Sequence, residues 1–226
     1  WKPETAGVTG LNPVTESTKI ETLDAKTENT DPKAFVELKN VTFGYDDRII
    51  LDHINIQVQK GEQVTLSGRT GAGKSTIFKL LLGLYEPQDG QVLIKGIQAG
   101  DIPESKKRTL FGYVEQSFHM VPGTVKDQIT LYDDSIPDEA VKQAAKMVGL
   151  GSSIEALEHG YDTICTPEVF SQGQWQLLSI ARAAAAGPEL LLLDEITANL
   201  DAETERAVLQ ALKQVSANRT VVSISH

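Results

Sequence analysis

The feature that most constrains this chain is a glycine-rich stretch between a short apolar strand pattern and a helical pattern. It consists of Gly68, Arg69, Thr70, Gly71, Ala72, Gly73, Lys74, Ser75 and Thr76. Glycines let consecutive backbone N–H groups close around a phosphate, and the start of the following helix adds positive potential there. Lys74 can reach the outer phosphates, and the Ser75 hydroxyl can bind Mg²⁺. The stretch therefore predicts a nucleoside triphosphate site, and a glycine-rich turn without a ligand is the alternative.

Two acids follow a wholly apolar run further along the chain. The run at 190–193 is four leucines, a pattern typical of a central parallel strand, and it delivers Asp194 and Glu195. Ligands of open α/β sheets bind at the carboxyl ends of such strands. Asp194 can hold Mg²⁺ opposite Ser75, and Glu195 can orient or deprotonate an attacking water. The alternative is that both acids only end the strand in solvent.

Composition limits the remaining possibilities. The 226 residues carry a formal net charge of -10, which argues against nucleic acid as the main partner. The single cysteine, Cys165, excludes a disulfide framework within the chain and a cysteine-cluster metal site. The sequence has no apolar run of membrane-spanning length and no signal-peptide pattern. These features fit a domain that works in a reducing compartment.

The order of patterns predicts an α/β core with a helical insertion. Residues 1–33 are rich in Thr, Glu, Asp and Asn and read as a linker. Alternating runs at 35–43 and 50–58 predict an antiparallel layer. The other predicted elements are strands at 63–66, 91–94, 110–114, 190–193 and from 220, and helices at 73–84, 137–148, 172–186 and 202–215.

One further motif makes the chain resemble the nucleotide-binding domain of ATP-binding-cassette (ABC) transporters. The run Phe170-Ser171-Gln172-Gly173-Gln174 precedes the long helix and the acidic strand, where the family usually carries Leu-Ser-Gly-Gly-Gln. The resemblance covers residues 34–226. It implies a P-loop NTPase core with a parallel central sheet, an antiparallel β layer and a helical signature subdomain at about 117–187.

The resemblance also implies ATP and Mg²⁺ as cofactors and a second ABC ATPase domain as partner in a head-to-tail dimer. In the family, the positions of Ser171, Gly173 and Gln174 contact the γ-phosphate held by the other domain. A serine before a helix offers a hydroxyl and free N–H groups to an anion, so the physical logic agrees. The alternative for Ser171 is an ordinary N-cap.

Four other positions match the family one by one. Tyr45 resembles the aromatic residue that stacks on adenine, with a packed tyrosine as the alternative. Gln116 resembles the glutamine that touches Mg²⁺ and senses the transmembrane partner. Asp201 lies in a run similar to the loop that crosses the dimer interface, and it can also cap the next helix. His226 resembles the switch histidine that contacts the γ-phosphate.

Two stretches are similar to the exporter type within the family. They are the run from Gln116 through 123–125 and 128–129, and the turn at 160–163. This similarity implies that residues 1–33 link the domain to a transmembrane domain absent from the chain. The domain is then expected at the cytoplasmic face of the cell membrane, and the chain is expected to stop before the last elements of the family fold.

Some positions depart from the family pattern. Phe170 replaces the usual leucine, Gln172 replaces a glycine, and Trp175 stands where a basic residue is common. The predicted function is an ATP-hydrolysing domain that powers export across a membrane. The alternatives are a soluble ABC ATPase acting on DNA or ribosomes, and a regulatory nucleotide-binding module with little turnover.

Overall fold

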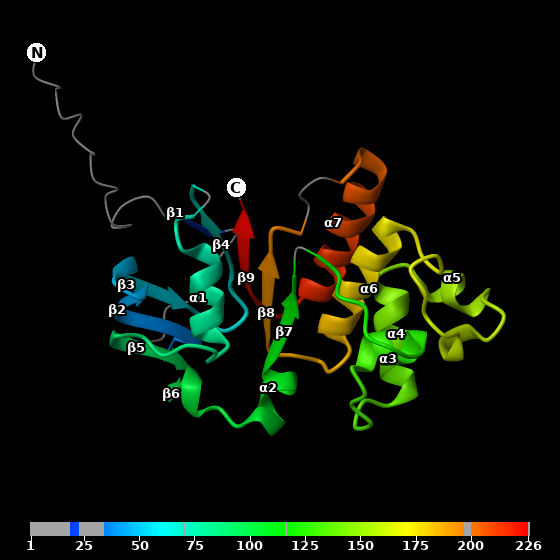
Figure 1. The fold of residues 1–226 in the computed structure, drawn as a ribbon, viewed down its shortest axis with the longest axis horizontal. Helices are drawn as coiled ribbons and strands as arrows, with labels where there is room; N and C mark the ends of the chain where they lie inside the picture. Colours follow the sequence, from blue (N-terminus) through cyan, green and yellow to red (C-terminus); the bar gives the residue numbers. More distant parts are fainter. Residues whose placement is uncertain (1–18, 23–33, 70, 116, 197–199, 226) are drawn as a thin grey trace, which may run out of the picture.

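The computed structural model describes residues 19–22, 34–69, 71–115, 117–196 and 200–225. In this part of the chain two sheets lie side by side, and a group of helices packs against the larger sheet (Figure 1). The strands of the larger sheet run in the order β1-β4-β9-β8-β7. They are β1 (Lys19–Thr22), β4 (Gln63–Ser67), β9 (Thr220–Ser225), β8 (Leu190–Asp194) and β7 (Phe111–Val114).

The neighbours β4, β9, β8 and β7 pair in parallel, whereas β1 pairs antiparallel with β4 at the edge. The smaller sheet is antiparallel, in the order β3-β2-β5-β6. Its strands are β2 (Val36–Tyr45), β3 (Arg48–Val58), β5 (Asp89–Ile94) and β6 (Ile97–Gln98). Both predicted layers, parallel and antiparallel, are therefore confirmed.

Helix α1 (Lys74–Leu81) follows β4, and α2 (Glu104–Leu110) precedes β7. Between β7 and β8 lies the helical region that the sequence predicts. It contains α3 (Val125–Thr130), α4 (Asp138–Met147), α5 (Gly151–Glu155) and α6 (Gln172–Ala184). Helix α7 (Ala202–Ser216) joins β8 to β9, and short 3₁₀ turns lie at Ala99–Asp101 and Gly160–Asp162.

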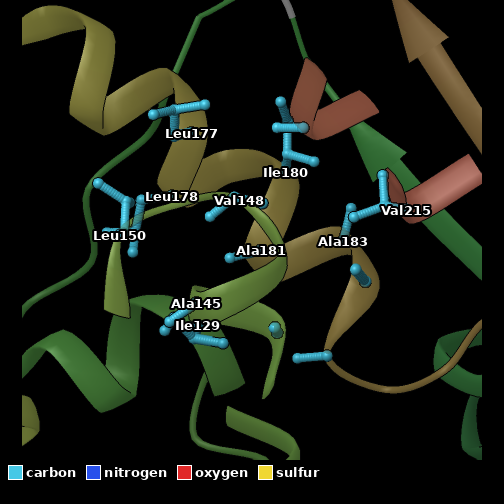
Figure 2. Packing of buried hydrophobic residues seen from close by; sticks show 14 of the residues in the cluster. Ile129, Ala145, Val148, Leu150, Leu177, Leu178, Ile180, Ala181, Ala183 and Val215 are labelled. Atoms are coloured by element: carbon cyan, nitrogen blue, oxygen red, sulfur yellow. The ribbon is translucent and has the colours of Figure 1, made fainter. Parts of the chain in front are cut away.

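Strand β8 separates two apolar clusters, which explains its unbroken leucine sequence. Successive side chains of a strand point to opposite faces. Leu190 and Leu192 belong to the cluster between the two sheets and α1, while Leu191 and Leu193 belong to the helical cluster. Figure 2 shows part of the second cluster, in which residues of α6 such as Leu178 pack with residues of α3, α4 and α7.

Three of the differences from the sequence prediction have a clear physical reason. Strand β1 lies inside the segment expected to be a linker, because its backbone groups can pair with the free edge of β4 whatever its composition. Helix α1 ends at Leu81 rather than near residue 84, and Gly83 has a φ of 68°, which a helix does not continue through. Helix α2 was not predicted, because no residue of it is buried and it has no apolar face to reveal it.

Candidate nucleotide-binding site

The glycine-rich loop joins β4 to α1, as its pattern predicts. Gly71 and Gly73 have φ values of 80° and 82°, in the left-handed region that favours glycine. Gly73 is also the N-cap of α1, and a β-carbon there would come within 2.7 Å of the Leu51 side chain. The sequence therefore needs glycine at this position for two reasons, backbone conformation and space.

Lys74 closes over this loop. Its side chain is only 5% exposed, and its Nζ donates hydrogen bonds to the carbonyl oxygens of Gly68 (2.6 Å) and Arg69 (3.2 Å). A buried ammonium group hydrogen-bonded to neutral carbonyls of the loop is placed to gain from an anion there. The loop and Lys74 thus fit a bound phosphate chain.

A pocket of about 430 Å³ opens beside the loop. It brings together parts of the chain that are distant in sequence. Its lining residues are Tyr45, Arg48, Ile50, Gly71, Ala72, Gly73, Lys74, Ser75, Thr76 and Glu195. The pocket therefore unites the predicted adenine-stacking residue, the predicted phosphate loop and the predicted general base.

Tyr45 lies at the end of β2 and both packs and lines the pocket. Its ring makes edge contacts with Phe43 (centroids 5.1 Å apart) and Tyr85 (5.6 Å). The Nζ of Lys79 lies 5.7 Å from the Tyr45 ring centroid. The aromatic neighbours fix the ring without removing it from the pocket, so packing and ligand stacking are compatible.

Asp194 ends β8, and its Oδ2 accepts a hydrogen bond from the Tyr113 hydroxyl at 3.2 Å. Burial raises the pKa of Asp194, and the nearby Glu195 and Glu115 raise it further, whereas the bond from Tyr113 and the charge of Lys74 oppose this rise. Burial and the neighbouring Asp194 raise the pKa of Tyr113. Sequence reasoning missed Tyr113, which no local motif marks.

Glu195 turns the chain sharply after β8. It has a φ of 47°, which residues with a side chain seldom adopt, and its backbone N–H donates to the Ile224 carbonyl at 3.3 Å. Residues held in this sparsely populated backbone region cluster at active sites and ligand-binding sites, although they also occur in ordinary turns. Here this conformation accompanies a side chain that lines the pocket beside Ser75.

The run at 170–174, called the signature below, leads into α6. The Ser171 N–H donates to Gln174 Oε1 (2.9 Å), and the Gln174 N–H donates to Ser171 Oγ (3.2 Å), which forms a capping box. The N-cap alternative for Ser171 is thus confirmed. The Ser171 side chain is also exposed at the start of α6. Among the described residues that line the pocket, none comes from α6. In Figure 1, α6 lies across β7 and β8 from α1.

Asp201 is the N-cap of α7. Its Oδ1 accepts hydrogen bonds from the N–H groups of Glu203 and Thr204, both at 3.0 Å, and its Oδ2 accepts one from the Thr204 hydroxyl at 2.6 Å. The hydrogen bond from the Thr204 hydroxyl is also the main reason why the pKa of Asp201 is lowered. The capping role predicted for Asp201 is confirmed, and a dimer-interface role stays a prediction.

Three predicted site residues, Thr70, Gln116 and His226, lie outside the described residues. Across the residues that the structure does describe, no three or more His, Cys, Asp or Glu side chains gather as metal ligands. The predicted Mg²⁺ ligands are instead the hydroxyl of Ser75, the amide of Gln116 and the carboxylate of Asp194. None of the helices in the described ranges combines the length and the apolar character that crossing a bilayer requires.

Comparisons with known proteins agree with this geometry. The family model described as ABC transporter matches residues 51–198. An uncharacterized ABC transporter ATP-binding protein of Bacillus subtilis is 38% identical, over 92% of this chain and 36% of its own length. The leukotoxin translocation ATP-binding protein of Mannheimia haemolytica is 35% identical, over 97% of this chain and 31% of its own.

Among solved structures, a bacterial Atm1-family ABC exporter with ATP bound superposes with a TM-score of 0.75 and 34% identity. The match covers 91% of this chain and 37% of that one, so the chain spans about a third of the length of its relatives. The matched range includes the phosphate loop and the two acids at the end of β8, Asp194 and Glu195. The chain therefore belongs to the ABC transporter family, as an ATPase domain similar to that of an ABC exporter.

Proposed function

We propose that this domain hydrolyses ATP to power the export of a substrate across a membrane, as part of a protein that also holds a transmembrane domain. The observation that carries the proposal is the pocket in which Tyr45, the phosphate loop and Glu195 meet. Relatives named for toxin translocation support export as the work that hydrolysis drives. Residues 1–33 would link the domain to the membrane part, at its cytoplasmic face.

Each residue of the pocket has a distinct task in this proposal. Tyr45 stacks on adenine, while Lys74 and the N–H groups of the loop bind the phosphates. Ser75 and Asp194, with Gln116, would hold Mg²⁺, which neutralises the negative charge that develops on the outer phosphates. Their oxygen donors suit that hard cation.

Glu195 accepts the proton of the attacking water. The left-handed turn at this residue, together with its place in the pocket wall, supports this assignment. His226 is proposed to contact the γ-phosphate, as its match to the family position implies.

A second ATPase domain completes the site in this proposal. The start of α6 carries Ser171, Gly173 and Gln174, and the helix dipole favours an anion there. However, the described residues that line the pocket of the same domain come from other elements. A head-to-tail dimer would place this helix start against the phosphates of the partner. Asp201, at the start of α7, would lie at the same interface. ATP would then favour the closed dimer because it binds that state more tightly.

The direct test replaces Glu195 in the purified full-length protein. Glu195→Gln keeps the shape of the side chain but loses the proton-accepting charge, so hydrolysis should slow by about 10²-fold or more while ATP still binds. Glu205→Gln, an exposed position on α7, is the matched control and should leave the rate unchanged. Comparable turnover in Glu195→Gln and the parent protein would remove Glu195 from the catalytic role.

A further inference from the structure

Three aromatic side chains meet beside the start of α6. The rings of Phe118 and Trp175 are stacked, with centroids 5.0 Å apart and planes at 26°. Phe170 meets Trp175 edge-on, also at 5.0 Å. Phe170 and Trp175 are two of the positions at which the sequence departs from the usual family motif. The departures are therefore packing partners of each other, and of a residue from the segment after β7.

The segment 118–121 also contacts α6 through Arg182 and α3 through Gln128. The guanidinium carbon of Arg182, in α6, lies 4.2 Å from the Phe118 ring centroid, and Arg182 Nη1 donates to the His119 carbonyl at 2.9 Å. Gln128, fully buried in α3, accepts from the Val121 N–H (2.9 Å) and donates to the Val121 carbonyl (2.7 Å). A movement of segment 118–121 must therefore be accommodated by α6.

Trp175 also holds the loop on the other side of Ser171. Its backbone N–H donates to the Ser171 carbonyl at 2.9 Å, within the first turn of α6. Its indole Nε1 donates to the Pro167 carbonyl at 3.3 Å, in the loop that leads to the signature. One half-buried side chain thus contacts the segment after β7, the loop before the signature and the residue that precedes Ser171.

We propose that Trp175 is a positioning residue for ATP hydrolysis, which acts with Phe118 to fix Ser171 and Gly173 relative to segment 118–121. This inference rests on the proposed head-to-tail dimer. Because Ser171 and Gly173 complete the site of the partner, Trp175 acts on the ATP bound by the other domain. A side chain that only fills the helical core would instead affect the stability of the fold. Its removal would not impair the ATP site of one domain more than that of the other.

Steady-state kinetics of the full-length protein give the first test. Trp175→Ala and Phe118→Ala should each lower kcat by about tenfold or more, since small misplacements of positioned groups are costly. The Kd for ATP should stay within about twofold, because the phosphate loop is untouched. The double variant should be little worse than either single one, because the two side chains act through one contact.

Two matched variants separate positioning from packing. Trp175→Phe keeps a ring for both aromatic contacts and should restore most of the rate. Tyr161→Ala removes another partly buried aromatic residue that packs on the same helical cluster, in a turn that contacts α3 and α5. It should lower the melting temperature with kcat unchanged. An equal loss of kcat in Tyr161→Ala and Trp175→Ala would overturn the proposal.

Dimers with one working site give the second test. Two differently tagged full-length copies are co-expressed and purified through both tags, and one copy carries Lys74→Ala. Hydrolysis and ATP retained after removal of free nucleotide are both measured. Trp175→Ala in the copy with Lys74→Ala should impair the remaining site, because that copy supplies its signature. Trp175→Ala in the other copy should not impair it.

Ser171→Arg in the same two arrangements separates the two proposals. One outcome is that the effect of Ser171→Arg depends on which copy carries it while Trp175→Ala has the same effect in either copy. In that case the role proposed for Trp175 is wrong, and the composite site, an ATP site shared by the two domains, stands. If neither variant depends on the arrangement, the composite site is wrong and the role of Trp175 falls with it.

Discussion

Gly173, in the first turn of α6, packs directly against Thr204 in α7. A β-carbon at residue 173 would come within 2.7 Å of Thr204 Cγ2 and 3.0 Å of its Oγ1. The Thr204 side chain cannot turn away freely, because its hydroxyl is bonded to Asp201 Oδ2 at 2.6 Å. The signature glycine is therefore required by the approach of two helices, and it connects the start of α6 with the cap of α7.

This contact predicts a specific rescue. Gly173→Ala should lower the melting temperature by several degrees, since overpacking costs about 1–3 kcal/mol. Adding Thr204→Ser removes the methyl group nearest to the new β-carbon and keeps the bond to Asp201, so it should recover much of the loss. Thermal unfolding of the two variants and of Thr204→Ser alone checks this. A double variant no more stable than Gly173→Ala would show that the clash does not determine stability.

The bond between Tyr113 and Asp194 predicts a change in metal dependence. Tyr113→Phe keeps the ring against Phe78 but removes the donor that orients the carboxylate. We expect the Mg²⁺ concentration for half-maximal hydrolysis to rise about tenfold, as for other groups that orient a metal ligand. Mn²⁺ binding followed by electron paramagnetic resonance, with ATP present, should weaken in parallel. An unchanged metal dependence would leave Tyr113 with a packing role only.

Asp194 should also cost stability when no ligand is bound. Its pKa is raised above the ordinary value of 3.8, so the folded state holds the proton more tightly than the unfolded state. The free energy of unfolding therefore falls as pH rises from 3.8 through the folded pKa, and at neutral pH the loss is complete. Asp194→Asn should raise the melting temperature at pH 7 by about 1–3 °C, with the gain shrinking below pH 4.

Asp201 is the control for this effect, because its pKa is lowered instead. Asp201→Asn should not raise the melting temperature at neutral pH. A lower melting temperature for Asp194→Asn at pH 7 would mean that the ionised carboxylate stabilises the ligand-free fold.

Tyr45 is predicted to bind adenine by stacking. Tyr45→Ala should weaken ATP binding by about 1–3 kcal/mol, judged from other aromatic–base contacts, whereas Tyr45→Trp should bind well. Calorimetric titration with ATP measures the difference. Equal affinity in Tyr45, Ala and Trp forms would reduce Tyr45 to its contacts with Phe43 and Tyr85.

Features that depend on neighbours in sequence were predictable. The phosphate loop, the leucines of β8 and the cap at Asp201 each follow from a local pattern, because glycine conformation, strand burial and capping are settled within a few residues. The pocket confirms that Tyr45 and Glu195 lie with the loop, although they are far apart in the chain.

Contacts between distant segments were not predictable. Tyr113 and Asp194 are 81 residues apart, and Arg182 and Gln128 are 54 apart. In both pairs, the neighbouring sequence gives no indication of the partner, because tertiary packing alone brings the two residues together. For the same reason the aromatic residues at 170 and 175 were identified only as departures, while the structure shows that they pack together.

The central claim is that ATP is hydrolysed between the phosphate loop of one domain and the signature of another. Mixed dimers of Lys74→Ala and Ser171→Arg copies of the full-length protein test it most directly. Each variant alone should be inactive, since it lacks either both phosphate loops or both signatures. The mixed dimer should regain one working site, where the intact loop of the Ser171→Arg copy faces the intact signature of the Lys74→Ala copy. Full activity of Ser171→Arg alone would contradict the account, and so would a mixed dimer as inactive as both parents.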